Sequence, residues 1–284
     1  MKKVIKSVLK AIINWFLIFL RNFKTGRYVC EQILDGSMNQ TKVIDHSGVK
    51  LIFAVPNSLS NYRADSFSTK EPETLEWIDS MPDGSVVWDI GANVGIYSCY
   101  AAKHRNCRVF AFEPSVFNLE LLARNIFLNE LTERVTIVPL PLSDELSLNG
   151  LNMTSTVWGG SMSTFGQSFG HDGETMQKVF VIPTIGLSMV DAVGLLRISQ
   201  PDYIKMDVDG IEHLILKGGI PVLSKTKSVL IEINDKFNTQ AQEADLYLRE
   251  AGFTLKEKRH ADYFDTDTTA ARHTYNQIWV KYIL

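Results

Sequence analysis

The chain has 284 residues, of which 45% are hydrophobic and 21% charged, and its formal net charge is −3 at pH 7. The hydrophobic share is too high for a disordered chain, and 18 glycines and 9 prolines are too few for a fibrous one. The negative charge predicts no nucleic-acid partner. The three cysteines have neither paired nor metal-ligand spacing, which indicates reduced thiols in a cytoplasmic protein.

Positive charge is concentrated at the N-terminus. Residues 1–27 contain seven Lys or Arg and no acidic residue, whereas residues 28–284 have a net charge of −10. Between Val4 and Leu20, apolar residues recur at helical spacing, and polar residues fill a sector of roughly 100° on the helical wheel. We therefore expect residues 1–27 to form a basic amphipathic helix.

Two environments suit this helix. It could lie in the interface of an anionic membrane, which would make the protein cytoplasmic and peripheral on the membrane, or its apolar face could pack on the body. A spanning anchor is disfavoured because the uncharged run Ala11–Leu20 has ten residues, whereas a bilayer crossing needs about 20. A signal peptide is disfavoured because no small-x-small cleavage site follows Leu20.

The rest of the chain divides into an N-terminal cap, residues 28–80, and a main domain, residues 81–284. Alternating apolar and polar residues predict a hairpin over Thr41–Phe53 that turns at His46–Gly48. A helix over Thr74–Ser80 is expected to end the cap.

A glycine turn follows a short apolar strand, Val86–Ile90, which is typical of a strand buried on both faces. Gly91 and Gly95 bracket the turn into a helix that begins near Asn93, where a ligand can approach the backbone closely. Their Gly-x-x-x-Gly spacing differs from the G-x-G-x-x-G of dinucleotide-binding folds. Asp89, just before the turn, would repel a pyrophosphate and suit a cationic amino-acid or sulfonium group.

A second apolar strand, Arg108–Phe112, ends in Glu113, 22 residues after Gly91. An acid at the tip of the second strand is placed to bind both ribose hydroxyls of an adenosine ligand. Together with Asp89, Glu113 favours S-adenosylmethionine as the cofactor. The alternative is an α/β protein whose glycines serve only the packing of helix on strand.

Further polar groups are expected at the same edge of the sheet. The strand after Glu113 leads to Ser143 and Asp144, either of which could reach the adenine, although Ser-Asp is also common turn chemistry. Beyond them, Trp158–Thr164 is expected to be a substrate-facing loop and Lys178–Pro183 a returning strand.

A fourth strand, Asp202–Val208, carries the candidate catalytic residues. Asp207, Asp209 and Glu212 cluster at its carboxyl end, where open α/β sheets bind ligands, and like charges this close raise at least one pKa. Asp207 is the first candidate for the base, with Glu212 or His213 behind it. Asp209 could instead cap the next helix. The other five histidines have no repeated spacing, and we expect them on the surface.

A fifth strand, Ser228–Asn234, brings Glu232 and Asn234 to the same edge. With Asp207 they could hold a divalent cation such as Mg²⁺, because oxygen ligands at adjacent strand tips suit it. A helix near Gln240–Ala251 and two closing strands are expected to complete the domain.

These residues resemble the FkbM-type methyltransferases, which use S-adenosylmethionine. The resemblance covers roughly residues 80 to 284 and is specific as a set, because the motifs occur in the family's order. It rests on Asp89–Ser98, Phe110–Ser115, Ile204–Glu212 with Gly218, and Leu230–Ile233.

The resemblance implies an α/β fold with a Rossmann-like class I methyltransferase sheet, of seven mostly parallel strands flanked by helices. Here an N-terminal helix and hairpin would extend it. It further implies O-methylation of a hydroxyl on a sugar, glycan, glycolipid or related natural product. The family's cofactor residues correspond to Asp89, Gly91, Asn93, Gly95 and Glu113.

This sequence departs from the family pattern at two positions. Asp209 stands where the family usually has Glu, and Leu142 stands where we expect Ala. We expect methyl transfer to a hydroxyl oxygen by in-line displacement, with the acceptor held in place by the protein. Two other functions stay open: a nucleotide-dependent oxidoreductase, which the glycine spacing disfavours, and a non-catalytic membrane- or glycan-binding module, which the acid cluster disfavours.

Overall fold

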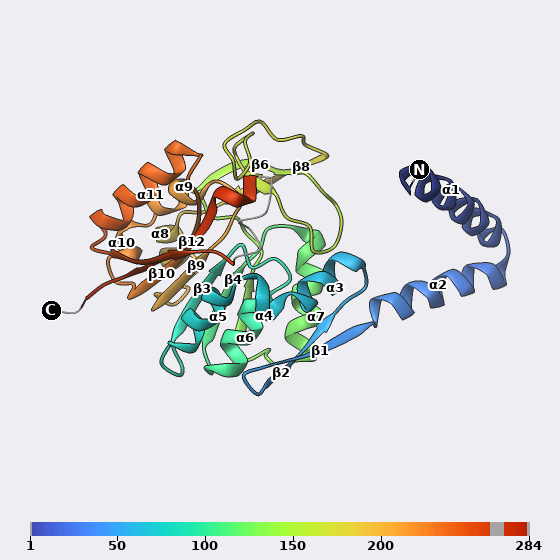
Figure 1. Ribbon diagram of the computed structural model, residues 1–284, viewed down its shortest axis with the longest axis horizontal. Coiled ribbons are helices and arrows are strands. Elements are labelled where there is room, and N and C mark those ends of the chain that lie inside the picture. The colour runs from blue at the N-terminus through green and yellow to red at the C-terminus, as the bar shows by residue number, and fades with distance from the viewer. Residues whose placement is uncertain (1, 262–269, 283–284) are drawn as a thin grey trace.

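The computed structural model describes residues 2–261 and 270–282. Its central feature is a seven-stranded sheet (Figure 1). The strands of this sheet are β3 (Val86–Ile90), β4 (Arg108–Phe112), β5 (Val135–Val138), β9 (Tyr203–Met206), β10 (Ser228–Asn234), β11 (Thr254–Arg259) and β12 (Thr274–Val280). Their order is β11-β12-β10-β9-β3-β4-β5, and all neighbours are parallel except β12, which is antiparallel to β10 and β11.

Helices cover both faces of the sheet, because parallel strands need crossover connections. This arrangement confirms the expected Rossmann-like α/β fold. One face is covered by α5 (Pro72–Asp79), α6 (Ile96–His104) and α7 (Val116–Leu128), and the other by α8 (Met189–Gly194), α9 (Glu212–Lys217), α10 (Ile220–Leu223) and α11 (Asn238–Glu250).

The alternation of β3 shows why its residues are apolar almost without a break. Trp88 and Ile90 point into one core, where Leu248 of α11 packs, while Val87 points into the opposite core with Tyr100 of α6. Both faces of the strand are therefore buried, and each apolar residue in the run contributes to one of the two cores.

The N-terminal cap contains the expected hairpin. Ala54, at the end of its second strand, donates its backbone N–H to the side-chain oxygen of Asn125 in α7 at 2.8 Å, which ties the hairpin to the main domain. The elements of the cap before α5 are β1 (Thr41–His46), β2 (Val49–Ala54), α3 (Ser58–Asp65) and α4 (Phe67–Lys70).

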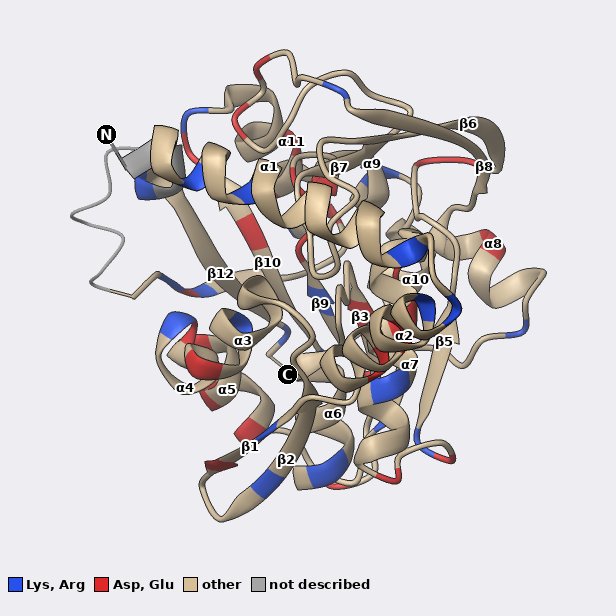
Figure 2. Cartoon of the chain, turned by 90° about the vertical axis from the view of Figure 1, so that its right-hand side faces the viewer, with Lys and Arg blue, Asp and Glu red and all other residues tan. Residues whose placement is uncertain are grey.

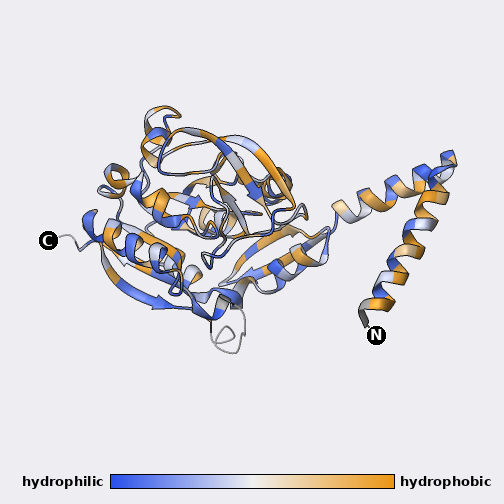
Figure 3. Ribbon diagram, turned by 90° about the horizontal axis from the view of Figure 1, so that it is seen from above, coloured by the Kyte–Doolittle hydropathy of each residue, from blue (hydrophilic) through white to orange (hydrophobic). Residues whose placement is uncertain are grey.

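Two helices precede the hairpin and project away from the rest of the molecule (Figures 1 and 3). They are α1 (Lys2–Arg21) and α2 (Lys24–Met38). The single helix expected over residues 1–27 is interrupted, since α1 ends at Arg21 and α2 begins at Lys24. The expected boundary at residue 27 therefore falls inside α2. Among the residues that the structure describes, no helix combines the length and apolarity that a bilayer crossing requires.

Much of the polar region after β5 is a small antiparallel sheet of order β7-β6-β8. The strand expected over Lys178–Pro183 corresponds to its last strand, whereas the first two strands were not predicted. A short 3₁₀ helix, η2 (Ala270–His273), precedes β12. The strands of the small sheet are β6 (Ser147–Met153), β7 (Ser163–Phe165) and β8 (Phe180–Gly186).

Candidate active site

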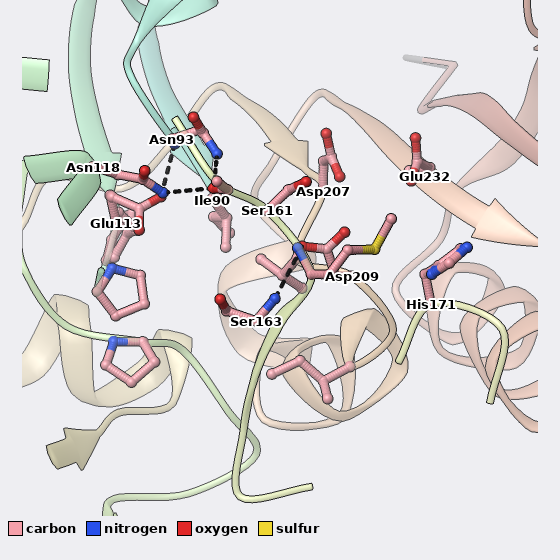
Figure 4. Close-up of a pocket in the computed structure, with 18 of the residues that line it drawn as sticks. Ile90, Asn93, Glu113, Asn118, Ser161, Ser163, His171, Asp207, Asp209 and Glu232 are labelled. Carbon is pink, nitrogen blue, oxygen red and sulfur yellow. Dashed lines mark hydrogen bonds between the residues drawn. The ribbon is translucent and has the colours of Figure 1, made fainter. Parts of the chain in front are cut away.

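A cavity of about 360 Å³ opens at the carboxyl ends of β3, β4, β9 and β10. In the view of Figure 4, Glu113 and Glu232 lie on opposite sides of this cavity, with Asp207 and Asp209 between them. Open α/β sheets bind their ligands at this edge. Apolar side chains of the lining include Ile90, Phe112, Leu140, Leu142, Leu151, Phe165 and Ile211.

The glycine turn contributes Gly91 to the lining of this cavity. Gly91 has a φ of +84°, and a Cβ on it would lie 1.9 Å from the backbone oxygen of Asp207, so only glycine fits. The N–H groups of Gly91 and the next residue donate to the backbone oxygen of Phe112 at 2.9 and 3.0 Å, which fixes the turn against β4. Gly95 does not line the cavity; its φ of +76° lets it serve as the N-cap of α6.

Glu113 is held at the tip of β4 by two backbone groups. Its Oε2 accepts the N–H of Asn93 at 2.8 Å, and its Oε1 accepts the N–H of Ser115 at 2.7 Å. The residue is only 5% exposed, and burial raises the pKa of its carboxyl to about 7, although both hydrogen bonds favour the ionised form. Its position matches that expected for a ribose-binding acid.

Asp89 lies behind the glycine turn rather than in the main cavity. It is buried, accepts a hydrogen bond from Ser98 Oγ at 2.5 Å, and lines a second cavity of about 40 Å³ that shares Gly91 with the first. Burial raises the pKa of Asp89, while the ammonium group of Lys205 acts in the opposite direction.

Lys205, in β9, and Asp207, directly after it, are two residues apart and point to the same side of the sheet. The Nζ of Lys205 lies 3.4 Å from Oδ2 of Asp207, and the lysine is buried whereas the Asp207 side chain is 29% exposed. Burial opposes the charge of Lys205, but the carboxylates of Asp207, Asp89 and Glu71 raise its pKa. The lysine is therefore a fixed positive charge beside a carboxylate that the cavity can reach.

Asp209 binds the loop across the cavity and does not cap a helix. Its Oδ2 accepts the N–H groups of Met162 and Ser163 at 2.6 and 3.3 Å (Figure 4), and the N-cap of α9 is Ile211. Burial and the neighbouring Asp207 raise its pKa to about 6. Burial contributes most to this rise, and the like charge of Asp207 adds to it in the direction expected for neighbouring acids.

Glu212 and His213 are buried and line neither cavity, which argues against the expected role of either as the base. Glu212 accepts the N–H groups of Val208 and Gly210 at 2.9 and 3.1 Å, and Nε2 of Gln240 in α11 at 2.5 Å. Because α9 packs on α11, these side chains point into that contact. Glu212 therefore holds the turn after β9 in place.

Glu232 lines the cavity but Asn234 does not. Burial and the Asp207 carboxylate raise the pKa of Glu232 well above its usual value. Asn234 is turned inward, where its Oδ1 accepts the N–H of Lys236 at 2.9 Å. The three expected metal ligands are thus not brought together, and the described part of the chain holds no group of three or more His, Cys, Asp or Glu arranged for a metal ion.

Ser143 and Asp144 also lie outside the cavity lining. The N–H of Ser143 donates to the backbone oxygen of Leu187 at 2.7 Å, and Oδ2 of Asp144 accepts Nζ of Lys217 at 3.1 Å. These bonds turn both residues toward α8 and α9. The cavity is lined instead by the residues just before them, 140–142.

The expected substrate-facing loop does line the cavity, and side chains that the sequence did not single out hold it there. Asn118 accepts the N–H of Gly159 at 3.1 Å and donates to the backbone oxygen of Gly160 at 3.0 Å. Arg63 donates twice to the oxygen of Gly159, at 2.9 and 2.7 Å. No local motif surrounds Asn118 or Arg63, so only their partners reveal this role.

The N-terminal cap supplies a polar wall that was also not predicted. Lys70, Glu71 and Glu73 line the cavity, and Lys70 Nζ lies 2.5 Å from Oε1 of Glu71. Burial opposes ionisation of Glu71, but the two neighbouring lysines lower its pKa. His171 and His260, expected on the surface, line the same cavity. Single histidines outside any motif carried no signal for this position.

Comparisons with known proteins identify relatives of this chain. The model of the family described as "Methyltransferase FkbM domain" matches residues 89–255. The chain is 23% identical over 201 residues to the hexuronic acid methyltransferase AglP of Haloferax volcanii, covering 70% of this chain and 77% of that protein. It is 26% identical over 165 residues to the methyltransferase sdnD of Sordaria araneosa, covering 50% of this chain and 62% of that protein.

Among solved structures, the methyltransferase FkbM from Methylobacillus flagellatus KT aligns with a TM-score of 0.48 at 16% identity, over 78% of this chain and 52% of that one. The residues of the cavity suit S-adenosylmethionine. Gly91 has no side chain, so a ligand can approach its backbone, Glu113 provides a carboxylate, and apolar side chains form one wall. The family model spans more than half of the chain, from Asp89 through β10 and into β11. The chain therefore belongs to the FkbM-domain family of S-adenosylmethionine-dependent methyltransferases.

Proposed function

We propose that the protein methylates a hydroxyl oxygen of a sugar, glycan, glycolipid or related natural product. The observation that carries this proposal is the continuity of the cavity. It extends from Glu113 at one side, past the glycine turn and Asp207, to Glu232 at the other, so a cofactor and an acceptor can share it.

The cofactor would occupy the side of the cavity that contains Glu113. Its carboxylate is placed to accept the ribose hydroxyls, and Leu140, Pro141 and Leu142 offer an apolar wall to the adenine in place of Ser143 and Asp144. S-adenosylmethionine supplies an electrophilic methyl group on its sulfonium.

Asp207 is the residue that we assign to proton removal. Glu113 and Asp209 accept hydrogen bonds from backbone N–H groups, whereas the carboxylate of Asp207 is 29% exposed and, among the described residues, forms its ion pair with Lys205. A carboxylate at this position can accept the proton of an acceptor hydroxyl. Lys205 acts as a positioning residue, because it contacts Asp207 from within the sheet.

The other side of the cavity favours an acceptor rich in hydroxyl groups. Its lining offers several hydrogen-bond donors and acceptors, from Glu73, Glu232, Asn276 and His171. The relative AglP is named for hexuronic acid, which supports a sugar as the acceptor class. The assigned roles need no divalent cation, and a chelator control tests whether one takes part.

Isothermal titration of the full chain with S-adenosylhomocysteine tests the cofactor assignment. Binding should be lost in Glu113→Ala and kept in Glu133→Ala, an acid on the surface. Transfer of a labelled methyl group to a panel of free sugars, glycosides and glycolipids, with and without EDTA, tests the acceptor. Absence of binding in the unmodified protein would overturn the cofactor site, and absence of transfer to every member of the panel would overturn the acceptor class.

A further inference from the structure

Helix α1 exposes a broad apolar surface. Every described side chain from Val4 to Arg21 is exposed or half-exposed, including Trp15 at 69% and Ile18 at 64%. Figure 3 shows α1 and α2 extending from the body, with apolar residues along α1. Packing of this face on the body, one of the two environments expected from the sequence, is therefore not what the structure shows. An apolar surface of this extent marks an interaction site.

A tight elbow joins α1 to α2, and a row of aromatic side chains continues through it. The N–H of Phe23 donates to the backbone oxygen of Leu20 at 3.1 Å, and a Cβ on Gly26 would lie 1.9 Å from that same oxygen. The rings of Trp15, Phe19 and Phe23 follow one another, with centroids 6.1 and 5.3 Å apart. The elbow thus carries a continuous aromatic row from α1 toward α2.

The charge of α1 is of one sign. Its sequence holds five basic residues and no acidic one, whereas residues 28–284 carry a net charge of −10. Figure 2 shows blue and no red segments along α1. Lys6 and Lys10 belong to the polar sector opposite the aromatic row. A helix with an apolar face and basic flanks complements a surface that is negatively charged at its rim and apolar below it.

A second copy of the chain fits this helix poorly. Helices that pair as coiled coils bury a narrow seam and match charges of opposite sign beside it. Here the apolar residues occupy most of the wheel, and two copies of α1 would bring only positive charges together. A bilayer crossing does not fit either, since no described helix has the required length and apolarity.

We propose that α1 lies flat in the interface of a bilayer with anionic lipids, with Lys6 and Lys10 at the head groups and Trp15, Phe16 and Phe19 in the acyl boundary. The helix would hold the methyltransferase domain at the membrane surface. This inference is independent of the acceptor proposed above, because α1 contributes no residue to the lining of the cavity.

Co-sedimentation of the full chain with vesicles tests the proposal. We expect the protein to pellet with phosphatidylcholine vesicles that contain phosphatidylglycerol, and to bind vesicles of phosphatidylcholine alone about tenfold more weakly. Added salt should weaken the binding, since exposed charges are screened. The double variant Lys6→Glu/Lys10→Glu and the double variant Ile12→Gln/Phe16→Gln should each reduce binding by about tenfold or more.

Matched controls separate a local effect from a change in net charge. Lys225→Glu/Lys236→Glu makes the same charge change on the exposed surface of the body and should pellet like the unmodified protein. Thermal unfolding of each variant checks that the domain is intact. Three results would overturn the proposal: no binding to anionic vesicles, equal loss in the body variant, or a dimer in solution that Ile12→Gln/Phe16→Gln dissociates.

Discussion

The ammonium group of Lys205 lies 3.4 Å from the carboxylate of Asp207, and the same lysine faces the buried Asp89 from within the sheet. One buried cation thus serves a carboxylate in the cavity and another behind the glycine turn. Lys205 thereby connects the two cavities, since Asp89 lies near the end of β3 and Asp207 directly follows β9. It also makes Lys205 important for both stability and reaction.

Replacing Lys205 by methionine should destabilise the fold strongly. The change leaves the Asp89 carboxylate buried without its cation and removes one of the two lysines beside Glu71. Removal of one member of a buried ionic group costs about 3–5 kcal/mol. Urea unfolding followed by circular dichroism measures the change. Lys227→Met is the matched control: its side chain is 57% exposed and pairs with Asp202 at the surface, so it should cost less than about 1 kcal/mol. Equal effects would show that the buried network adds no stability.

Asp207→Asn should abolish turnover and leave the affinity for S-adenosylhomocysteine within a few-fold of the unmodified protein. The amide keeps the shape of the side chain but cannot take the proton, and general-base catalysis contributes about 10²–10⁴-fold in rate. Methyl-transfer rates and titration of the same preparation measure both quantities. A variant with near-normal turnover would remove Asp207 from the mechanism.

Glu212→Gln should behave differently, although the two acids are five residues apart. Its side chain holds the N–H groups of Val208 and Gly210, so the amide would place a donor against donors and lower stability by about 1–3 kcal/mol. We expect turnover to persist at temperatures where the variant is folded. Loss of turnover in a variant of unchanged stability would return Glu212 to the candidates for the base.

Gly91→Ala should weaken cofactor binding beyond the effect of backbone strain alone. Gly84 provides the control, because its φ of +78° is similar but a Cβ there meets nothing within 4 Å. Gly84→Ala should cost about 1–2 kcal/mol of stability and leave binding unchanged. Gly91→Ala adds a clash with the backbone of Asp207, and titration should show a loss of affinity of about tenfold or more. Equal affinities in the two variants would contradict this prediction.

The pH dependence of binding should report on Glu113. Its pKa in the free protein is raised to about 7, so the ionised form that accepts ribose hydroxyls is depleted below that pH. Affinity for S-adenosylhomocysteine should therefore rise as pH increases through about 7 and then level off. Asp209 and Glu212 also have raised pKa values. The contribution of Glu113 is therefore the difference between the pH profiles of affinity for the unmodified protein and for Glu113→Gln. Parallel profiles for the two proteins would contradict the assignment.

The same raised pKa affects stability with a definite sign. The folded protein keeps the Glu113 proton up to about pH 7, whereas the unfolded chain releases it near pH 4.5. Between these values the folded state binds more protons, so this group makes the free energy of unfolding fall as pH rises. Urea unfolding of the unmodified protein should show this slope, and Glu113→Gln should reduce it.

The central sheet and the edge that carries the site could be predicted from local sequence patterns. Val86–Ile90 and Arg108–Phe112 coincide with β3 and β4, because a strand buried on both faces is a nearly continuous apolar run. Gly91 and Glu113 follow directly from those strands, so their placement is fixed by local chain geometry. The acids after β9 reach the same edge for the same reason.

Which polar residues face the cavity depends on the tertiary structure and could not be predicted from local sequence. Arg63, Lys70 and His171 come from the cap and from the polar region after β6, and chain folding alone brings them to the sheet edge. Glu212 was expected beside Asp207, yet the contact between α9 and α11 turns it away. A motif specifies the path of the backbone over a few residues, whereas the direction and partners of a side chain depend on packing between distant segments.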